Sequence, residues 1–160
     1  MSVFETAQEL ITQVCLGKTI EHDLVSKLVL IDANLQGAKF KRVTIDNVNF
    51  DSANLSHSHF TDVVFNQVNL SNVNFNNANL AGSVFVNVIC DGTDFTHADL
   101  TGVIFIAEKV ATFNSDDVDI DINTLNLPLS TQQSLAAAKI CGFSKGKASL
   151  NKAILTGAVL

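Results

Sequence analysis

The sequence predicts a solenoid, a fold in which short copies of one unit stack along an axis. From Leu30 to Phe105 every fifth residue is Leu, Phe, Ile or Cys. Two residues before each of them stands a smaller side chain, such as Ala33, Val43 or Ser58. A five-residue unit is too short to bury its own apolar side chains, so it must stack on copies of itself. The length of the chain predicts a single domain over residues 1–160.

The first predicted element is an amphipathic helix over residues 2–16. Ser2 and Glu5 have the spacing of a capping box, and Gly17 stands where a helix ends. We expect this helix to cover the open end of the first coil, although a helix that binds a partner is the alternative. The side predicted to be buried consists of Val3, Phe4, Ala7, Leu10, Ile11, Val14 and Cys15.

The main solenoid is predicted over residues 18–106. Its first units fit weakly, because Ile20 and Val25 occupy large positions while Asp23 occupies a small one. From there the units are regular to Phe105.

Three segments follow the main solenoid. Residues 107–129 are acidic and keep the five-residue phase weakly, which predicts a distorted coil or a loop. A capping-box spacing followed by an Ala- and Leu-rich run predicts a short helix over 130–141. The repeat resumes over residues 146–160, where the large positions are Leu150, Leu155 and Leu160.

Units such as DSANL, NNANL and THADL resemble the A(D/N)LXX signature of the pentapeptide-repeat family. The resemblance covers sixteen consecutive central units and the last three of the chain. It implies an all-β solenoid, a right-handed quadrilateral β-helix in which four units form the four sides of one coil. Residues twenty apart then stack in four inner columns, which begin at Leu30, Leu35, Phe40 and Ile45.

The outward positions predict one apolar side among polar ones. Two explanations are open: the helix at 130–141 and the loop before it cover this side, or a partner or second copy of the chain binds there. The predicted interaction or helix-docking face consists of Val64, Val84, Val86, Ile89, Ile104 and Ile106, with Ile89 on the adjoining side.

Composition restricts the class of partner. The net charge is −6 and Arg42 is the only arginine, which argues against direct binding of nucleic acid. No apolar run is long enough to cross a membrane. Glu5 and Glu9 stand where a targeting peptide would carry basic residues, so we expect a cytoplasmic protein.

The sequence predicts no catalytic, metal or cofactor site. Cys15, Cys90 and Cys141 lack metal-ligand spacing, and Cys90 is expected in the core. His57 and His97 share a corner but lie two coils apart, too far to ligate one metal ion. The acidic run over residues 116–121 lacks the glycine and final glutamate of a calcium loop.

These observations favour a noncatalytic protein-interaction or scaffold module. Its partner is either a second copy of the chain, which would make a homodimer, or another protein that the sequence does not identify. The family resemblance adds an alternative, because some members resemble B-form DNA in size and charge and protect type II topoisomerases from quinolones. A second alternative is a ligand-binding or enzymatic site in the non-repetitive segment 107–147.

Overall fold

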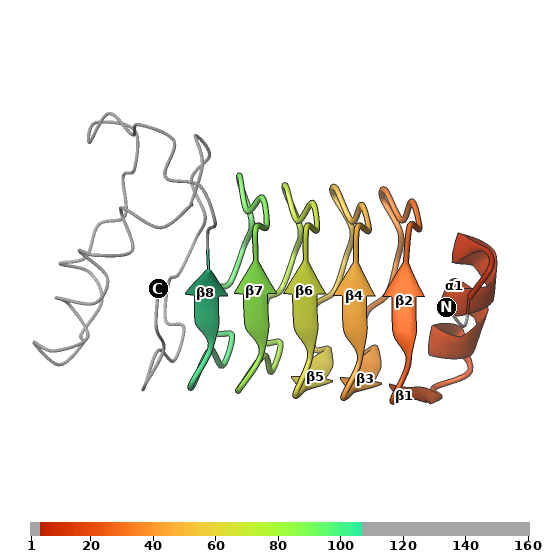
Figure 1. The fold of residues 1–160 in the computed structure, drawn as a ribbon, viewed down its shortest axis with the longest axis horizontal. Helices are drawn as coiled ribbons and strands as arrows, with labels where there is room; N and C mark the ends of the chain where they lie inside the picture. Colours follow the sequence, from red (N-terminus) through yellow and green to blue (C-terminus); the bar gives the residue numbers. More distant parts are fainter. Residues whose placement is uncertain (1–3, 107–160) are drawn as a thin grey trace, which may run out of the picture.

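A computed structural model describes residues 4–106, which form one helix followed by a β-solenoid of about four coils (Figure 1). Helix α1 (Ala7–Cys15) lies at the N-terminal end of the solenoid. The strands are β1 (Thr19–Glu21), β2 (Leu24–Ser26), β3 (Lys39–Lys41), β4 (Thr44–Asp46), β5 (His59–Thr61), β6 (Val64–Asn66), β7 (Val84–Val86) and β8 (Ile104–Ile106).

All strands pair in parallel with the strand one coil away. Residues twenty apart are partners, as in Thr44 with Val64, so each coil takes twenty residues. One side of the solenoid is the three-stranded sheet β1-β3-β5 and the next is the five-stranded sheet β2-β4-β6-β7-β8. Single bridges such as Asn49 to Asn69 and Asn54 to Asn74 form the other two sides. The predicted solenoid is confirmed, and its right-handed winding stays a prediction.

The residue before the large position differs between the turn sides and the strand sides, although Val29 and Ile89 stand on a turn side without a side-chain acceptor. Where that residue is Asn or Asp, its side-chain oxygen accepts the N–H two residues later, as Asn54 does from Ser56 at 3.1 Å and Asp94 from Thr96 at 2.8 Å. This Asx turn replaces the strand. Residues such as Val64, which have no side-chain acceptor, leave the backbone extended.

The corners of the coil depend on a left-handed backbone. Every fifth residue from Gly17 to Gly102 has a positive φ, between 51° and 73°. None of these residues is β-branched, because a branched Cβ fits this conformation poorly. The corner N–H then donates to the next coil, as Asn72 does to the carbonyl of Asp91 at 2.7 Å.

The core consists of the predicted inner columns. The rings of Phe65 and Phe85 stack with centroids 4.6 Å apart and planes 6° apart, and Phe75 stacks on Phe95 at 5.3 Å. Both arrangements put one ring over the next at the spacing of parallel strands. The inward assignment of the large positions is therefore confirmed.

Buried hydroxyls at small positions keep hydrogen bonds. Ser58, Ser83 and Thr93 are fully buried, and the Thr93 hydroxyl donates to the carbonyl of Leu70 at 2.7 Å. A polar atom in the core is tolerated because a backbone acceptor lies within reach.

The helix begins later than expected. Thr6, not Ser2, caps it: the Thr6 hydroxyl accepts the N–H of Glu9, and the Glu9 carboxylate accepts the N–H of Thr6. The prediction for Cys15 was also wrong, because this residue is exposed. Cys15 lies about 100° around the helix from Val14, which is buried with Leu10.

The predicted loop at 107–129, helix at 130–141 and repeats at 146–160 lie outside the described residues. The predicted N-terminal helix is confirmed, because α1 lies at the N-terminal end of the solenoid (Figure 1), and its role as a cap stays a prediction.

We expect Phe65→Ala to lower the free energy of unfolding by about 3–5 kcal/mol, because it opens a cavity between stacked rings. Chemical denaturation measures this, with Thr61→Ala as the control, since Thr61 is exposed. Equal effects of the two substitutions would contradict the inward assignment of Phe65.

Two corner glycines offer a matched pair. Gly37 and Gly92 have φ of +70° and +69°, but a Cβ on Gly92 would lie 2.5 Å from Asn72 Oδ1, whereas a Cβ on Gly37 would meet nothing within 4 Å. We expect Gly37→Ala to cost about 1 kcal/mol for the left-handed backbone. Gly92→Ala should cost clearly more in the same denaturation experiment, because Asn72 must also move and its bond to Asp51 is disturbed.

Candidate functional site

The apolar face is an outward surface on β6, β7 and β8, made of Val64, Val84, Val86, Ile104 and Ile106. The parallel register stacks Val64, Val84 and Ile104 in one column. In the second column Val86 and Ile106 follow Asn66. The middle residue of each strand points into the core, so its two neighbours face outward.

The apolar face begins where a polar ladder ends. One coil earlier, Asn66 donates to the carboxylate of Asp46 at 2.6 Å in the second column. Val86 interrupts this ladder, and exposure increases toward the end of the sheet. Ile104 and Ile106 are 38% and 45% exposed, whereas Val84 is half-buried. The sheet therefore changes from polar to apolar along its own length.

Ile89 does not join this sheet. It lies beyond the corner residue Asn87, bridges Asn69 on the adjoining side, and is 44% exposed. The structure thus brings five of the six predicted residues together and leaves Ile89 on the adjoining side, where the sequence places it.

Sequence reasoning missed other exposed apolar residues. Val29 is 63% exposed and Ile31 is 48% exposed, in the first coil of the side that carries Ile89. Val29 and Ile89 belong to one column, with Asn49 and Asn69 between them. Comparing the outward residues of this column from the first coil onward would have identified Val29.

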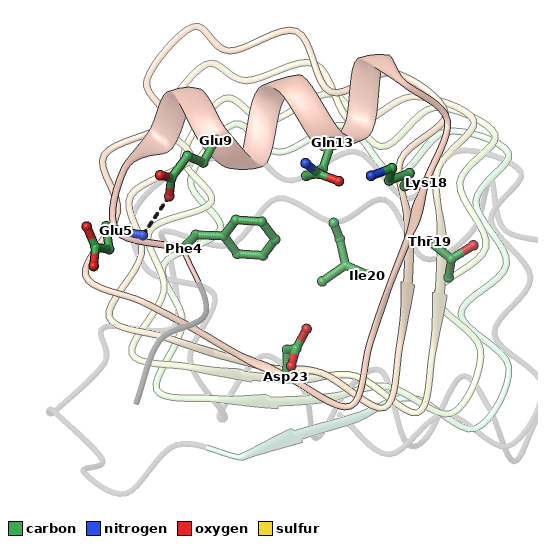
Figure 2. Close-up of a pocket in the computed structure, with 8 residues that line it drawn as sticks. All are labelled: Phe4, Glu5, Glu9, Gln13, Lys18, Thr19, Ile20 and Asp23. Atoms are coloured by element: carbon green, nitrogen blue, oxygen red, sulfur yellow. Dashed lines mark hydrogen bonds between the residues drawn. The ribbon is translucent and has the colours of Figure 1, made fainter.

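A pocket lies between α1 and the first coil (Figure 2). Its volume is about 690 Å³, and the side chains of Phe4 and Ile20 point into it among mostly polar lining residues. Asp23 lies across from the helix, and in the sequence this acidic residue at a small position indicated only a weak fit to the repeat. The full lining is Phe4, Glu5, Glu9, Gln13, Lys18, Thr19, Ile20 and Asp23.

The pocket offers little chemistry. Its Glu9 carboxylate already accepts the N–H groups of Glu5 at 2.9 Å and Thr6 at 3.3 Å, so it serves the helix cap. Lys18 places a positive charge among the remaining carboxylates. The printed hydrogen bonds of this lining serve the helix cap and bring no acid and base together.

Residues 4–106 contain no group of three or more His, Cys, Asp or Glu side chains that could hold a metal ion. His57 and His97 are exposed corner residues with positive φ. The acidic run at 116–121 lies outside the described residues. Within the described part of the chain, no helix is long and apolar enough to span a bilayer.

Cys90 is a core residue, as predicted. Its side chain is 2% exposed, and burial raises the pKa of the thiol to about 12, although a hydrogen bond with Thr93 opposes the shift. A neutral thiol of this kind is a poor nucleophile.

A model of the family described as pentapeptide repeats matches residues 29–67 and 64–102, with eight copies of its repeat. No curated protein matches the chain. Solved structures do match it. One is a pentapeptide repeat protein from the Arabidopsis thaliana thylakoid lumen, with 23% identity and a TM-score of 0.50, covering 81% of this chain and 73% of that one.

Two cyanobacterial structures are similar. HetL of Nostoc sp. strain PCC 7120, involved in heterocyst differentiation regulation, has 16% identity and a TM-score of 0.52, covering 89% of this chain and 60% of HetL. A pentapeptide repeat protein from Cyanothece 51142 has 14% identity and a TM-score of 0.52, covering 95% of this chain and 93% of that one. At these identities the likeness concerns the fold.

We expect a thiol reagent at pH 8 to label Cys15 but not Cys90 in the folded protein, in a Cys141→Ser background. Cys15 is exposed, whereas the Cys90 thiol is buried and protonated. Labelling in denaturant should reach both, and fast native labelling of Cys90 would contradict its burial.

The raised pKa of the Cys90 thiol also makes the stability of the protein depend on pH. The unfolded thiol ionises near its ordinary pKa of 9.0 while the folded thiol stays protonated to about 12, so stability should fall as pH rises between these values. Denaturation of the native chain and of Cys90→Ala across this range should show a steeper loss for the native chain.

Proposed function

The chain belongs to the pentapeptide-repeat family, and we propose that it is a noncatalytic protein-binding module whose contact surface is the apolar face. The observation that carries the proposal is the register of β6, β7 and β8, which stacks apolar side chains outward on a regular sheet. Folded proteins seldom leave such a patch uncovered.

The rigidity of the sheet supports a binding role. Each strand pairs in parallel with its neighbour, and the rings of Phe65 and Phe85 under β6 and β7 are fully buried, whereas Phe105 under β8 is partly buried. Outward side chains on this scaffold need little ordering when a partner binds, so the entropic cost of association is small.

The apolar face is smaller than a complete protein interface. It extends over two strand spacings of roughly 4.8 Å and two outward columns. A stable interface buries about 800 Å² per partner. The five side chains therefore form the centre of a contact, and polar neighbours such as Asn66 and Asn87 form its rim. A second copy of the chain or another protein with an apolar patch fits this description.

Binding to a topoisomerase as a DNA mimic ranks second. Its support is the acidic composition, but Lys39, Lys41 and Arg42 lie together at β3 and interrupt a negative surface. Rescue of gyrase supercoiling from a quinolone by the purified protein would favour this alternative. An enzymatic site at 107–147 lies outside the described residues.

The cytoplasm stays the proposed compartment. Cys15 and Cys90 are both free thiols, as expected where the medium is reducing.

Val84→Glu tests the contact surface, because it places a charge at the centre of the apolar face. The control is Thr44→Glu, in the same outward column but two coils earlier, where Thr44 is exposed. We expect Val84→Glu to abolish self-association in sedimentation velocity, or capture of a protein from lysate, while Thr44→Glu keeps it. Both variants should unfold close to the native midpoint.

Two outcomes would contradict the proposal. If Val84→Glu alone unfolds the protein, the apolar face is covered by the rest of the chain. If both variants bind like the native chain, the contact surface lies elsewhere.

A further inference from the structure

The pocket between α1 and the first coil has the layout of a small-molecule binding site. The side chains of Phe4 and Ile20 are buried and point into it, whereas its rim is polar (Figure 2). The exposed rim residues are Glu5, Glu9, Lys18 and Thr19. Its volume of about 690 Å³ is within the range of known ligand sites, which combine apolar contact area with a few polar groups that orient the ligand.

Asp23 places a carboxylate at an inward position of the repeat. The residues of the same column in the following coils are all buried, namely Val43, Val63, Ser83 and Val103. Asp23 itself is half-buried, and its side chain points into the pocket from the side opposite α1 (Figure 2). The pocket is therefore bordered by a negative charge at a position where each later described coil carries a neutral side chain.

The Asp23 carboxylate forms no hydrogen bond or ion pair in the described part of the chain. The ion pair found there joins Glu21 to His22 at 4.0 Å, so Lys18 does not neutralise Asp23. Glu9, in contrast, accepts the N–H groups of the helix cap. A carboxylate that loses water without gaining a donor is unfavourable, so Asp23 favours a ligand that donates hydrogen bonds and carries a positive charge.

The lining as a whole favours a cation over an anion. It has three carboxylates, on Glu5, Glu9 and Asp23, against the single ammonium group of Lys18. An aromatic ring such as that of Phe4 also attracts a cation to its face. The two apolar side chains of the pocket favour a ligand with an apolar body, because burying such a body against them removes apolar surface from water.

We propose that the pocket binds a small organic cation, with an amine or guanidinium group on an apolar body. The cationic group donates hydrogen bonds to Asp23, and the apolar body packs against Phe4 and Ile20. The site lies at the N-terminal end of the solenoid and shares no residue with the apolar face, so it does not depend on the protein-binding role proposed above.

Three probes of similar shape and different charge test the class of ligand. Phenethylamine is the cation, phenethyl alcohol is its neutral counterpart, and phenylpropionate is its anionic counterpart. Each is titrated into the full native chain and followed by NMR chemical shifts. We expect phenethylamine to bind at least about tenfold more tightly than the alcohol, which is the difference that one charge-assisted hydrogen bond supplies. Phenylpropionate should bind least, and the shifts caused by phenethylamine should be centred on Phe4, Ile20 and Asp23.

Asp23→Asn tests the carboxylate, and Glu21→Gln is its matched control. Glu21 is exposed on β1, close to Asp23 in the sequence but outside the lining. We expect Asp23→Asn to weaken the binding of phenethylamine by about tenfold and to leave phenethyl alcohol unchanged, because the charge is lost while the size is kept. Glu21→Gln should bind all three probes like the native chain. Circular dichroism checks the fold of both variants, and the comparison of probes on the native chain is decisive even if Asp23→Asn does not fold.

Four outcomes would overturn the proposal. The first is equal binding of phenethylamine and phenethyl alcohol to the native chain, and the second is equal binding of phenethylamine to the native chain and to Asp23→Asn. The third is a set of shifts centred on acidic residues elsewhere, such as Asp94 and Asp99, which would mean attraction to the acidic surface in general. The fourth is self-association of Asp23→Asn with unchanged affinity for phenethylamine, which would mean that the carboxylate keeps a second copy from stacking on this end.

Discussion

The structure depends on one backbone constraint, a left-handed residue at every fifth position. From Gly17 to Gly102 this residue has a positive φ and turns the chain, and between His22 and Asn87 nearly all of these residues donate their N–H to a carbonyl of the next coil. Because the turn recurs every five residues, the same position of every unit points inward. The stacked columns of Phe and Leu are a consequence of the corners, and they in turn stabilise the coils by burial.

The core was predictable from the sequence, whereas the corners were not. Leu and Phe at every fifth position give a periodic signal that one chemical property explains. The corner position holds His22, Lys27, Ser52 and Gln67 as well as glycine, so it shares no property except the lack of a branched Cβ. The lack of β-branched residues at one position of the repeat is difficult to recognise in a single sequence. The helix start was misplaced for a similar reason, because Ser2 and Thr6 both have a glutamate three residues later.

The residues that share the apolar face could be predicted from the sequence, but the contacts around them could not. The five-residue period shows that Val84 and Ile104 share a column. It does not show that Asn66 donates a hydrogen bond to Asp46 in the column where Val86 comes next. The spacing of residues in the sequence does not reveal side-chain contacts between coils. The pocket next to α1 could not be predicted either, because it depends on the position of the helix, and the repeat pattern does not specify that position.

The location of the apolar face follows from the chemistry of the sides. On turn sides the outward residue before the large position is mostly Asn or Asp, and its oxygen accepts a backbone N–H, as in Asn74. Replacing it costs a hydrogen bond within the fold. On strand sides the same position carries no such bond and is free to vary, as Thr44, Val64 and Ile104 demonstrate. Apolar outward residues therefore cost least on the strands, where β6, β7 and β8 carry them in consecutive coils, whereas on the turn side Val29 and Ile89 are separated by Asn49 and Asn69.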